Sequence, residues 1–189
     1  MQFSKGELIG FGISLGFAVV LSVAISFFVQ AKLSDFKDGT VIKGFGKHAN
    51  VATSTVNKNT ILKVAFDVGK GAKVGEVNNR FDSLARFINM HVAAGVPKEN
   101  IELALVVHGG ASFDLLNDAT YQKAHQQNNP NKTLIEELLA NNVRIILCGQ
   151  TAAARDISLT QLISGSEIEL SAMTAHALLQ NAGFTVNPF

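Results

Sequence analysis

Apolar and polar residues alternate in blocks from Thr60 to the C-terminus, and the periodicity changes from one block to the next. Short runs rich in β-branched residues predict strands, and apolar residues at helical spacing predict helices between them. Strands are expected at 61–68, 101–107, 143–147, 167–170 and 184–186. This alternation is typical of an α/β fold with a mostly parallel sheet that helices cover on both faces.

The helix expected after the first strand has the clearest apolar stripe. Its apolar residues recur at steps of four, three, four and four: Val77, Phe81, Leu84, Ile88 and Val92. Gly95 and Pro97 mark its end. Thr133 and Glu136 have the spacing of a capping box, which predicts a helix through Ala140. The remaining segments are expected to form helices at 113–116, 151–155 and 171–181, and a polar loop at 121–129.

Residues 8–31 carry no charge and follow Lys5, a pattern that predicts an export signal or a membrane anchor. Residues 29–31 suit a signal peptidase, with cleavage before Lys32. The apolar stretch 9–29 is 21 residues long, however, which is enough to span a bilayer without being cleaved. A buried core helix is a third interpretation, but such helices are usually shorter. Both a signal and an anchor place the folded part outside the cytoplasm, in a bacterial periplasm.

The chain divides into three predicted regions. Residues 1–31 form the signal peptide or membrane anchor, and residues 32–59 form a polar approach segment that is too short for a core of its own. Residues 60–189 are long enough to form one domain with a sizeable core. We expect the approach segment to lie over that domain as a linker.

Composition narrows the classes of function. The 16 Lys and Arg residues are balanced by 15 Asp and Glu and form no run, so nucleic acid is not an expected partner. The single cysteine cannot form an intramolecular disulfide, and together with the wide spacing of the histidines it predicts no metal site. No cofactor motif is found. The glycine-rich segment 69–75 lacks the spacing of a phosphate loop and is interpreted as a solvated loop after a strand that ends near Asp67.

Cys148 ends a predicted strand and precedes a predicted helix. Open α/β sheets bind ligands at the carboxyl ends of their strands, and the amides of Gly149, Gln150 and Thr151 at a helix N-terminus would stabilise a thiolate. Gly149 would also let the backbone approach a bound sulfur or anion closely. The alternative is that Cys148 only packs, because free cysteine is among the most buried residue types.

His108 ends the second predicted strand, as Cys148 ends the third, and is followed by Gly109. If these two strands are neighbours, both side chains lie on the same edge of the sheet. Adjacent strands lie about 4.8 Å apart, so His108 could reach a ligand at Cys148 and act as an acid, a base or an anion partner. Alternatively, it hydrogen-bonds a turn carbonyl. The other histidines are less promising, being placed in the linker, near a helix end, in a polar loop and on the last helix: His48, His91, His125 and His176.

Several short motifs together resemble the DsrE/DsrF family, in the exported branch that carries Cys-Gly-Gln. They are Val106-Val107-His108-Gly109, Asn129-Pro130-Asn131, Leu134-Ile135, Leu147-Cys148-Gly149-Gln150-Thr151, Leu170-Ser171-Ala172-Met173-Thr174 and Gly183-Phe184-Thr185-Val186, while 39–46 resembles the approach segment of that branch. The resemblance implies a three-layer α/β/α sandwich around a mainly parallel five-stranded sheet, assembly as a homo-oligomer, and sulfur carried as a persulfide on Cys148. The better-known members are cytoplasmic, whereas this chain is predicted to be exported, so its sulfur donor and acceptor stay open.

Three hypotheses follow for the function. In the first, the protein is a periplasmic sulfur carrier, or sulfurtransferase-like, in which Cys148 accepts sulfane sulfur. His108, Gly109 and the 149–151 turn then bind and stabilise the anion. In the second, the chain is a non-catalytic oligomeric binding or assembly module whose cysteine is structural. In the third, Cys148 forms a disulfide between two copies.

Overall fold

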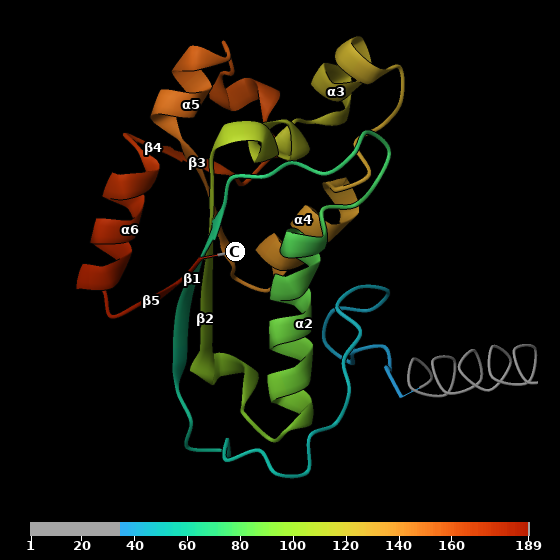
Figure 1. Ribbon diagram of the computed structural model, residues 1–189, viewed down its shortest axis with the longest axis vertical. Coiled ribbons are helices and arrows are strands. Elements are labelled where there is room, and N and C mark those ends of the chain that lie inside the picture. The colour runs from blue at the N-terminus through green and yellow to red at the C-terminus, as the bar shows by residue number, and fades with distance from the viewer. Residues whose placement is uncertain (1–34, 189) are drawn as a thin grey trace, which may run out of the picture. The chain divides into compact units, whose positions relative to one another are not determined.

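The computed structural model describes residues 35–188, in which the folded unit begins at Asp38 and contains a five-stranded sheet (Figure 1). The strands are β1 (Leu62–Val68), β2 (Ile101–Val107), β3 (Arg144–Cys148), β4 (Glu167–Glu169) and β5 (Thr185–Pro188). Their order across the sheet is β4-β3-β2-β1-β5, and every pairing is parallel. The predicted α/β sandwich is therefore confirmed, with a sheet that is parallel throughout.

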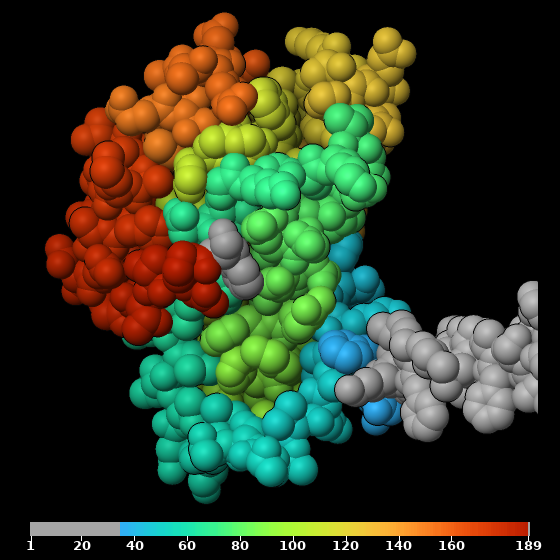
Figure 2. Space-filling view, in the orientation of Figure 1, coloured from blue at the N-terminus to red at the C-terminus, as the bar shows by residue number. Residues whose placement is uncertain are grey.

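Helices connect the strands and form the two outer layers. They are α2 (Asn79–Ala93), α3 (Asp118–His125), α4 (Lys132–Ala140), α5 (Gly149–Ala154) and α6 (Ala172–Asn181), with 3-10 turns at Lys98–Asn100, Gly109–Leu115 and Leu159–Gln161. In Figure 1, α2 and α4 cover one face of the sheet and α6 covers the other. Figure 2 shows the orange and red C-terminal segments gathered on one side of the domain and the green α2 segment facing the viewer beside them.

Two apolar clusters lie on opposite faces of the sheet because side chains alternate along each strand. Phe66, Leu105 and Ile145 point into the larger cluster, where Phe81, Leu84 and Ile88 of α2 are fully buried: the predicted helical stripe forms this contact. Each of these side chains stabilises the fold by about 1.5–3 kcal/mol. The smaller cluster joins the sheet to α6 through Ala65, Ala104, Val106, Ile146, Ala175 and Leu179. Its alanines allow α6 to pack close to the strands.

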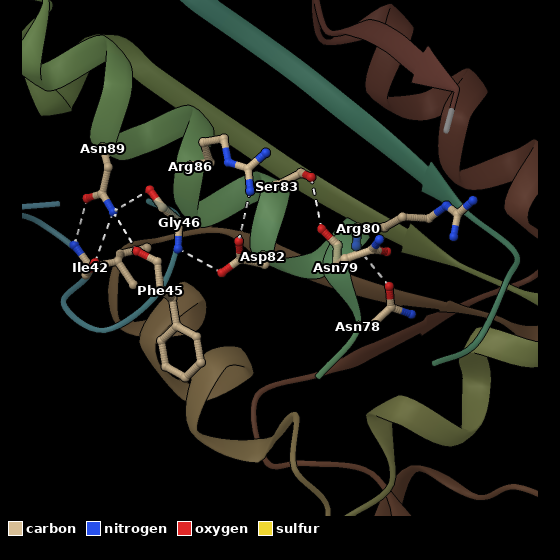
Figure 3. A network of polar contacts seen from close by, with 10 residues as sticks. All are labelled: Ile42, Phe45, Gly46, Asn78, Asn79, Arg80, Asp82, Ser83, Arg86 and Asn89. Atoms are coloured by element: carbon tan, nitrogen blue, oxygen red, sulfur yellow. Dashed lines mark hydrogen bonds and ion pairs between the residues drawn. The ribbon is translucent and has the colours of Figure 1, made fainter. Parts of the chain in front are cut away.

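The segment before β1 is held on α2 by a buried asparagine (Figure 3). Asn89 accepts a hydrogen bond from the Ile42 amide at 3.0 Å and donates to the carbonyls of Ile42 at 2.9 Å and Phe45 at 3.1 Å. Asp82, about two turns earlier on α2, accepts from the Gly46 amide at 2.7 Å. The side chain of Ile42 is fully buried in the larger apolar cluster. These contacts attach part of the predicted approach segment to the same core as the strands.

Two local predictions differ from the structure. The segment 121–129, expected to be a loop, contains most of α3, whose N-terminus is capped by the side chain of Asn117. The capping box at Thr133 and Glu136 is wrong: α4 begins at Lys132 with Asn131 as its N-cap and without a side-chain capping bond. Asn131 accepts from the Asn78 amide at 2.7 Å instead, so a tertiary contact replaces the local cap.

The predicted signal or anchor at 1–31 lies outside the described residues. Among residues 35–188, the helices are too short or too polar to cross a bilayer.

Candidate functional site

Cys148 is the last residue of β3 and the N-cap of α5, and its residue surface is only 6% exposed. Burial raises the pKa of its thiol. The backbone amide and hydroxyl of Thr151 and the backbone amides of Ala172 and Gln150 lower it more, so that the pKa lies below its ordinary value. Hydrogen bonds to the thiolate are the physical cause. Ala172 opens α6, so the amino ends of two helices meet at one sulfur.

His108 and Cys148 are neighbours across the carboxyl edge of the sheet. Val107 of β2 is in register with Leu147 of β3. His108 follows Val107 directly, and Cys148 follows Leu147. Within residues 35–188, the ring of His108 bonds a carboxylate and not the turn carbonyl given as its alternative partner. Its Nε2 lies 3.2 Å from Oδ2 of Asp67, a residue of β1. Three adjacent strands thus contribute one side chain each to this edge.

Asp67 also binds a second histidine. Nε2 of His176, on α6, lies 2.8 Å from Oδ1 of the same carboxylate. Burial raises the pKa of Asp67, but the hydrogen bonds from His176 and His108 and their charges lower it more, so that the carboxylate is held ionised. The sequence analysis predicts that His176 is one of the less promising histidines. The structure corrects this prediction, because His176 lines the cavity and contacts Asp67. Its Nδ1 is buried and has no hydrogen-bond partner among the described residues.

The period of two along the strands explains why these groups meet. Ala65, Val106 and Ile146 point toward α6, and the next residues on the same face are Asp67, His108 and Cys148. Apolar contact with α6 therefore ends where the polar row begins, and the first turns of α6 cover that row. His176 lies one residue after Ala175, which packs in the smaller cluster.

Close backbone approaches fix the geometry around the sulfur. A Cβ at Gly149 would lie 2.6 Å from the Glu169 carbonyl oxygen, so Gly149 allows α5 to pack on the end of β4. This differs from the prediction that the space serves a bound anion. Gly109 has φ +52°, and its amide donates to Oγ1 of Thr151 at 3.2 Å. A Cβ at Gly69 would lie 2.5 Å from Cε1 of His108, so Gly69 makes room for the imidazole.

An open cavity of about 630 Å³ lies in front of these residues. Its walls come from the strand ends, from α5 and α6, and from β5: Asp67, His108, Cys148, Gln150, Thr151, Ser171, Ala172, Met173, His176, Gln180, Val186 and Pro188. A thiol with a lowered pKa beside two imidazoles is equipped for nucleophilic attack and proton transfer.

The predicted site residues fall into two groups. Cys148, His108, Gln150 and Thr151 line the cavity, whereas Gly109 and Gly149 lie behind it and support Thr151 and α5. Sequence reasoning missed three contributions, from Asp67, His176 and the 171–173 turn. Asp67 could have been found from its place at a strand end, in line with His108 and Cys148. In the described part of the chain, no cluster of three or more His, Cys, Asp or Glu side chains has the arrangement of a metal site.

Comparison with known proteins agrees with this architecture. A family model described as the DsrE/DsrF-like family matches residues 63–188. The solved structure of MTH1491, a protein of unknown function from Methanobacterium thermoautotrophicum, is 15% identical with a TM-score of 0.52, covering 68% of this chain and 99% of that one. The ychN protein from E. coli is 27% identical with a TM-score of 0.49, covering 68% of this chain and 100% of its own. No curated protein matches this chain.

Proposed function

Because this chain belongs to the DsrE/DsrF-like family, we propose that it is a sulfur carrier in which Cys148 accepts sulfane sulfur as a persulfide and passes it on. The observation that carries the proposal is the place of Cys148 at the N-cap of α5, in the wall of a cavity that the first residues of α6 also line. Donors from both helices lower the pKa of its thiol. A thiolate is the nucleophile that sulfur transfer requires, and these donors favour it. The sulfur relays known in the family also support a persulfide on Cys148.

Loading is a displacement at sulfur. The Cys148 thiolate attacks the outer sulfur of a donor R–S–SH, the new S–S bond forms on Cys148, and the bond between the two donor sulfurs breaks. The donor leaves as a thiolate, RS⁻, and takes up a proton. His108 lines the same cavity, and its ring, which Asp67 holds in place, can relay that proton to the leaving thiolate.

Unloading reverses these roles. An acceptor thiolate attacks the outer sulfur of Cys148-S-SH, and the Cys148 thiolate leaves. The amides that lower the pKa of Cys148 stabilise this leaving group as well. One cysteine is therefore sufficient for a carrier, since the outer sulfur moves to the acceptor without a second thiol in this chain.

The setting of this reaction is part of the proposal. The apolar segment 8–31 supports export, with the domain working in the periplasm, either free after cleavage or attached to the inner membrane. A homo-oligomer is supported by the family resemblance and by exposed apolar side chains near the cavity, Leu170 at 67% and Met173 at 79% exposed. The natural donor and acceptor are left open.

Mass spectrometry tests the function directly. The full-length chain, kept in a nonionic detergent, is treated with the hydropersulfide of 2-mercaptoethanol and measured intact. The expected result is the addition of one or more sulfur atoms to the wild type and none to Cys148→Ser. Because Cys148 is the only cysteine, no other thiol can mask the outcome. Equal addition to both chains, or to neither, would contradict a carrier role.

A non-catalytic binding or assembly module is the second candidate, favoured by the low exposure of Cys148. In that case the thiol only packs, and iodoacetamide should label it slowly in the native protein at every pH below the ordinary thiol pKa of ~8.5. A carrier should label well below that pH. A disulfide between two copies, the third hypothesis, would appear as a dimer on non-reducing gels that reductant removes.

A further inference from the structure

The charges around the cavity are unbalanced. Asp67 is the one acidic residue among those that line it, and neither Lys nor Arg is among them. Both imidazoles direct Nε2 at the Asp67 carboxylate. An incoming donor therefore meets the Cys148 thiolate and a carboxylate whose two oxygens already hold the imidazoles, and neither Lys nor Arg is in the lining to pair with a further negative charge. A second negative charge on the donor would be repelled by both.

The size and remaining walls of the cavity suit an organic group. Its volume of about 630 Å³ lies within the usual range of small-molecule sites, about 300–1,000 Å³, and far exceeds what one sulfur atom needs. Met173, Val186 and Pro188 form an apolar wall, and Gln150 and Gln180 add uncharged amides. These groups can pack against and hydrogen-bond a neutral substituent.

We propose that the small-molecule donors of this site are organic hydropersulfides, R–S–SH, whose R group is uncharged. This inference rests on the proposed function. The outer sulfur moves to Cys148 and R–S⁻ leaves, to be protonated to R–SH in the cavity. Atoms and electrons balance without an added oxidant or reductant: one S–S bond breaks as another forms. Anionic sulfur compounds are disfavoured by charge rather than by size.

A matched pair of donors tests this choice. The hydropersulfides of 2-mercaptoethanol and of 2-mercaptoethanesulfonate carry the same two-carbon chain and differ in a hydroxyl against a sulfonate. The full-length chain in nonionic detergent is mixed with each, and the rate of sulfur addition to Cys148 is followed by mass spectrometry. The hydroxyl donor should react about tenfold faster at low salt, and the advantage should shrink at about 1 M salt, where charges are screened within ~3 Å.

A change of charge in the wall provides the second readout. Met173 is exposed, so Met173→Lys can be accommodated, and it should bring the ratio of the two rates toward one. Met173→Gln, which alters the side chain without charge, should keep the ratio whatever it does to either rate. Equal rates in the wild type, or a faster sulfonate donor, would overturn the inference alone. Sulfur addition from neither donor would overturn the proposed carrier function and this inference with it.

Discussion

Nε2 of His176 lies 2.8 Å from Oδ1 of Asp67 and joins residues that are 109 positions apart in the chain. The contact ties α6 to the end of β1, and the other carboxylate oxygen of Asp67 holds His108. One carboxylate therefore orients the imidazoles on two walls of the Cys148 cavity. Asp67 is a positioning residue in this arrangement, since it acts on sulfur transfer through the histidines.

Replacing Asp67 by Asn should slow sulfur transfer from the Cys148 persulfide to a small thiol by about a hundredfold. An amide can accept from one imidazole, but its NH₂ group opposes the N–H of the other, so one ring loses its position. The rate of transfer from the Cys148 persulfide to a small thiol is measured for each chain at one pH. Asp38→Asn is the matched control, because Asp38 is exposed and pairs only loosely with Lys47 at 3.7 Å. Equal loss in both variants would contradict a role specific to Asp67.

The same carboxylate should make stability depend on pH in acid. The pKa of Asp67 is lower in the folded state than in the unfolded chain, so its ionised form adds stability above the unfolded value of ~3.9. That contribution is lost as the pH falls through the folded pKa. Urea unfolding from pH 7 to pH 2 should therefore show the advantage of the wild type over Asp67→Asn shrinking toward low pH. A difference that stays constant would show that the carboxylate is not held ionised by its histidines.

Thr151→Val should raise the pKa of Cys148, because it removes the hydroxyl that donates to the thiolate. The wild-type rate of alkylation by iodoacetamide should reach half its maximum below the ordinary thiol pKa of ~8.5, and the variant curve should move to higher pH. Thr151→Ser keeps the hydroxyl and should leave the curve near that of the wild type. Coincident curves for all three chains would assign the lowered pKa to the backbone amides alone.

Gly69→Ala should displace His108, because the added Cβ would lie 2.5 Å from Cε1 of the imidazole. We expect sulfur transfer to slow by about tenfold or more with little effect in a His108→Ala background, where the ring is absent. Gly110→Ala is the control nearby: its Cβ would meet its nearest atom, the Gly71 amide nitrogen, at 3.4 Å. A penalty that persists without the His108 ring would indicate a general disturbance of the loop.

Asn89→Ala should destabilise the domain by about 3 kcal/mol, because it leaves the buried Ile42 amide and the carbonyls of Ile42 and Phe45 without their partner. Urea unfolding measures the loss, and limited proteolysis should cut near residues 39–46 in the variant first. Asn79→Ala, at an exposed position of the same helix, should be close to neutral. The alkylation curve of Cys148 should not change, since Asn89 lies on the helix layer opposite α6; a shifted curve would contradict that separation.

The apolar pattern of a segment predicted its secondary structure correctly where that segment buries its apolar residues against the core. The apolar run of β2 predicted a buried strand, and β2 is buried. In the predicted stripe, Phe81, Leu84 and Ile88 are buried in α2, whereas Val77 precedes the helix and is exposed. Pattern failed where tertiary contacts replaced local ones. In α3 only Tyr121 is buried, so no stripe marks the helix. At α4 the bond between Asn131 and Asn78 sets the start of the helix in place of the Thr133 cap.

The sequence by itself determined the order of strands and helices, and it placed Cys148 and His108 at strand ends, because short-range periodicity and β-branched runs decide those features. Only the tertiary structure decided which strands are neighbours, which face the sulfur shares with Asp67, and that His176 reaches that carboxylate from α6. Hydrogen bonds across 41 and 109 positions depend on how the sheet is ordered and how closely α6 packs on Ala65 and Ala104. The thiol at the end of β3 was visible in the sequence, whereas the charges and imidazoles that surround it come together only in the fold.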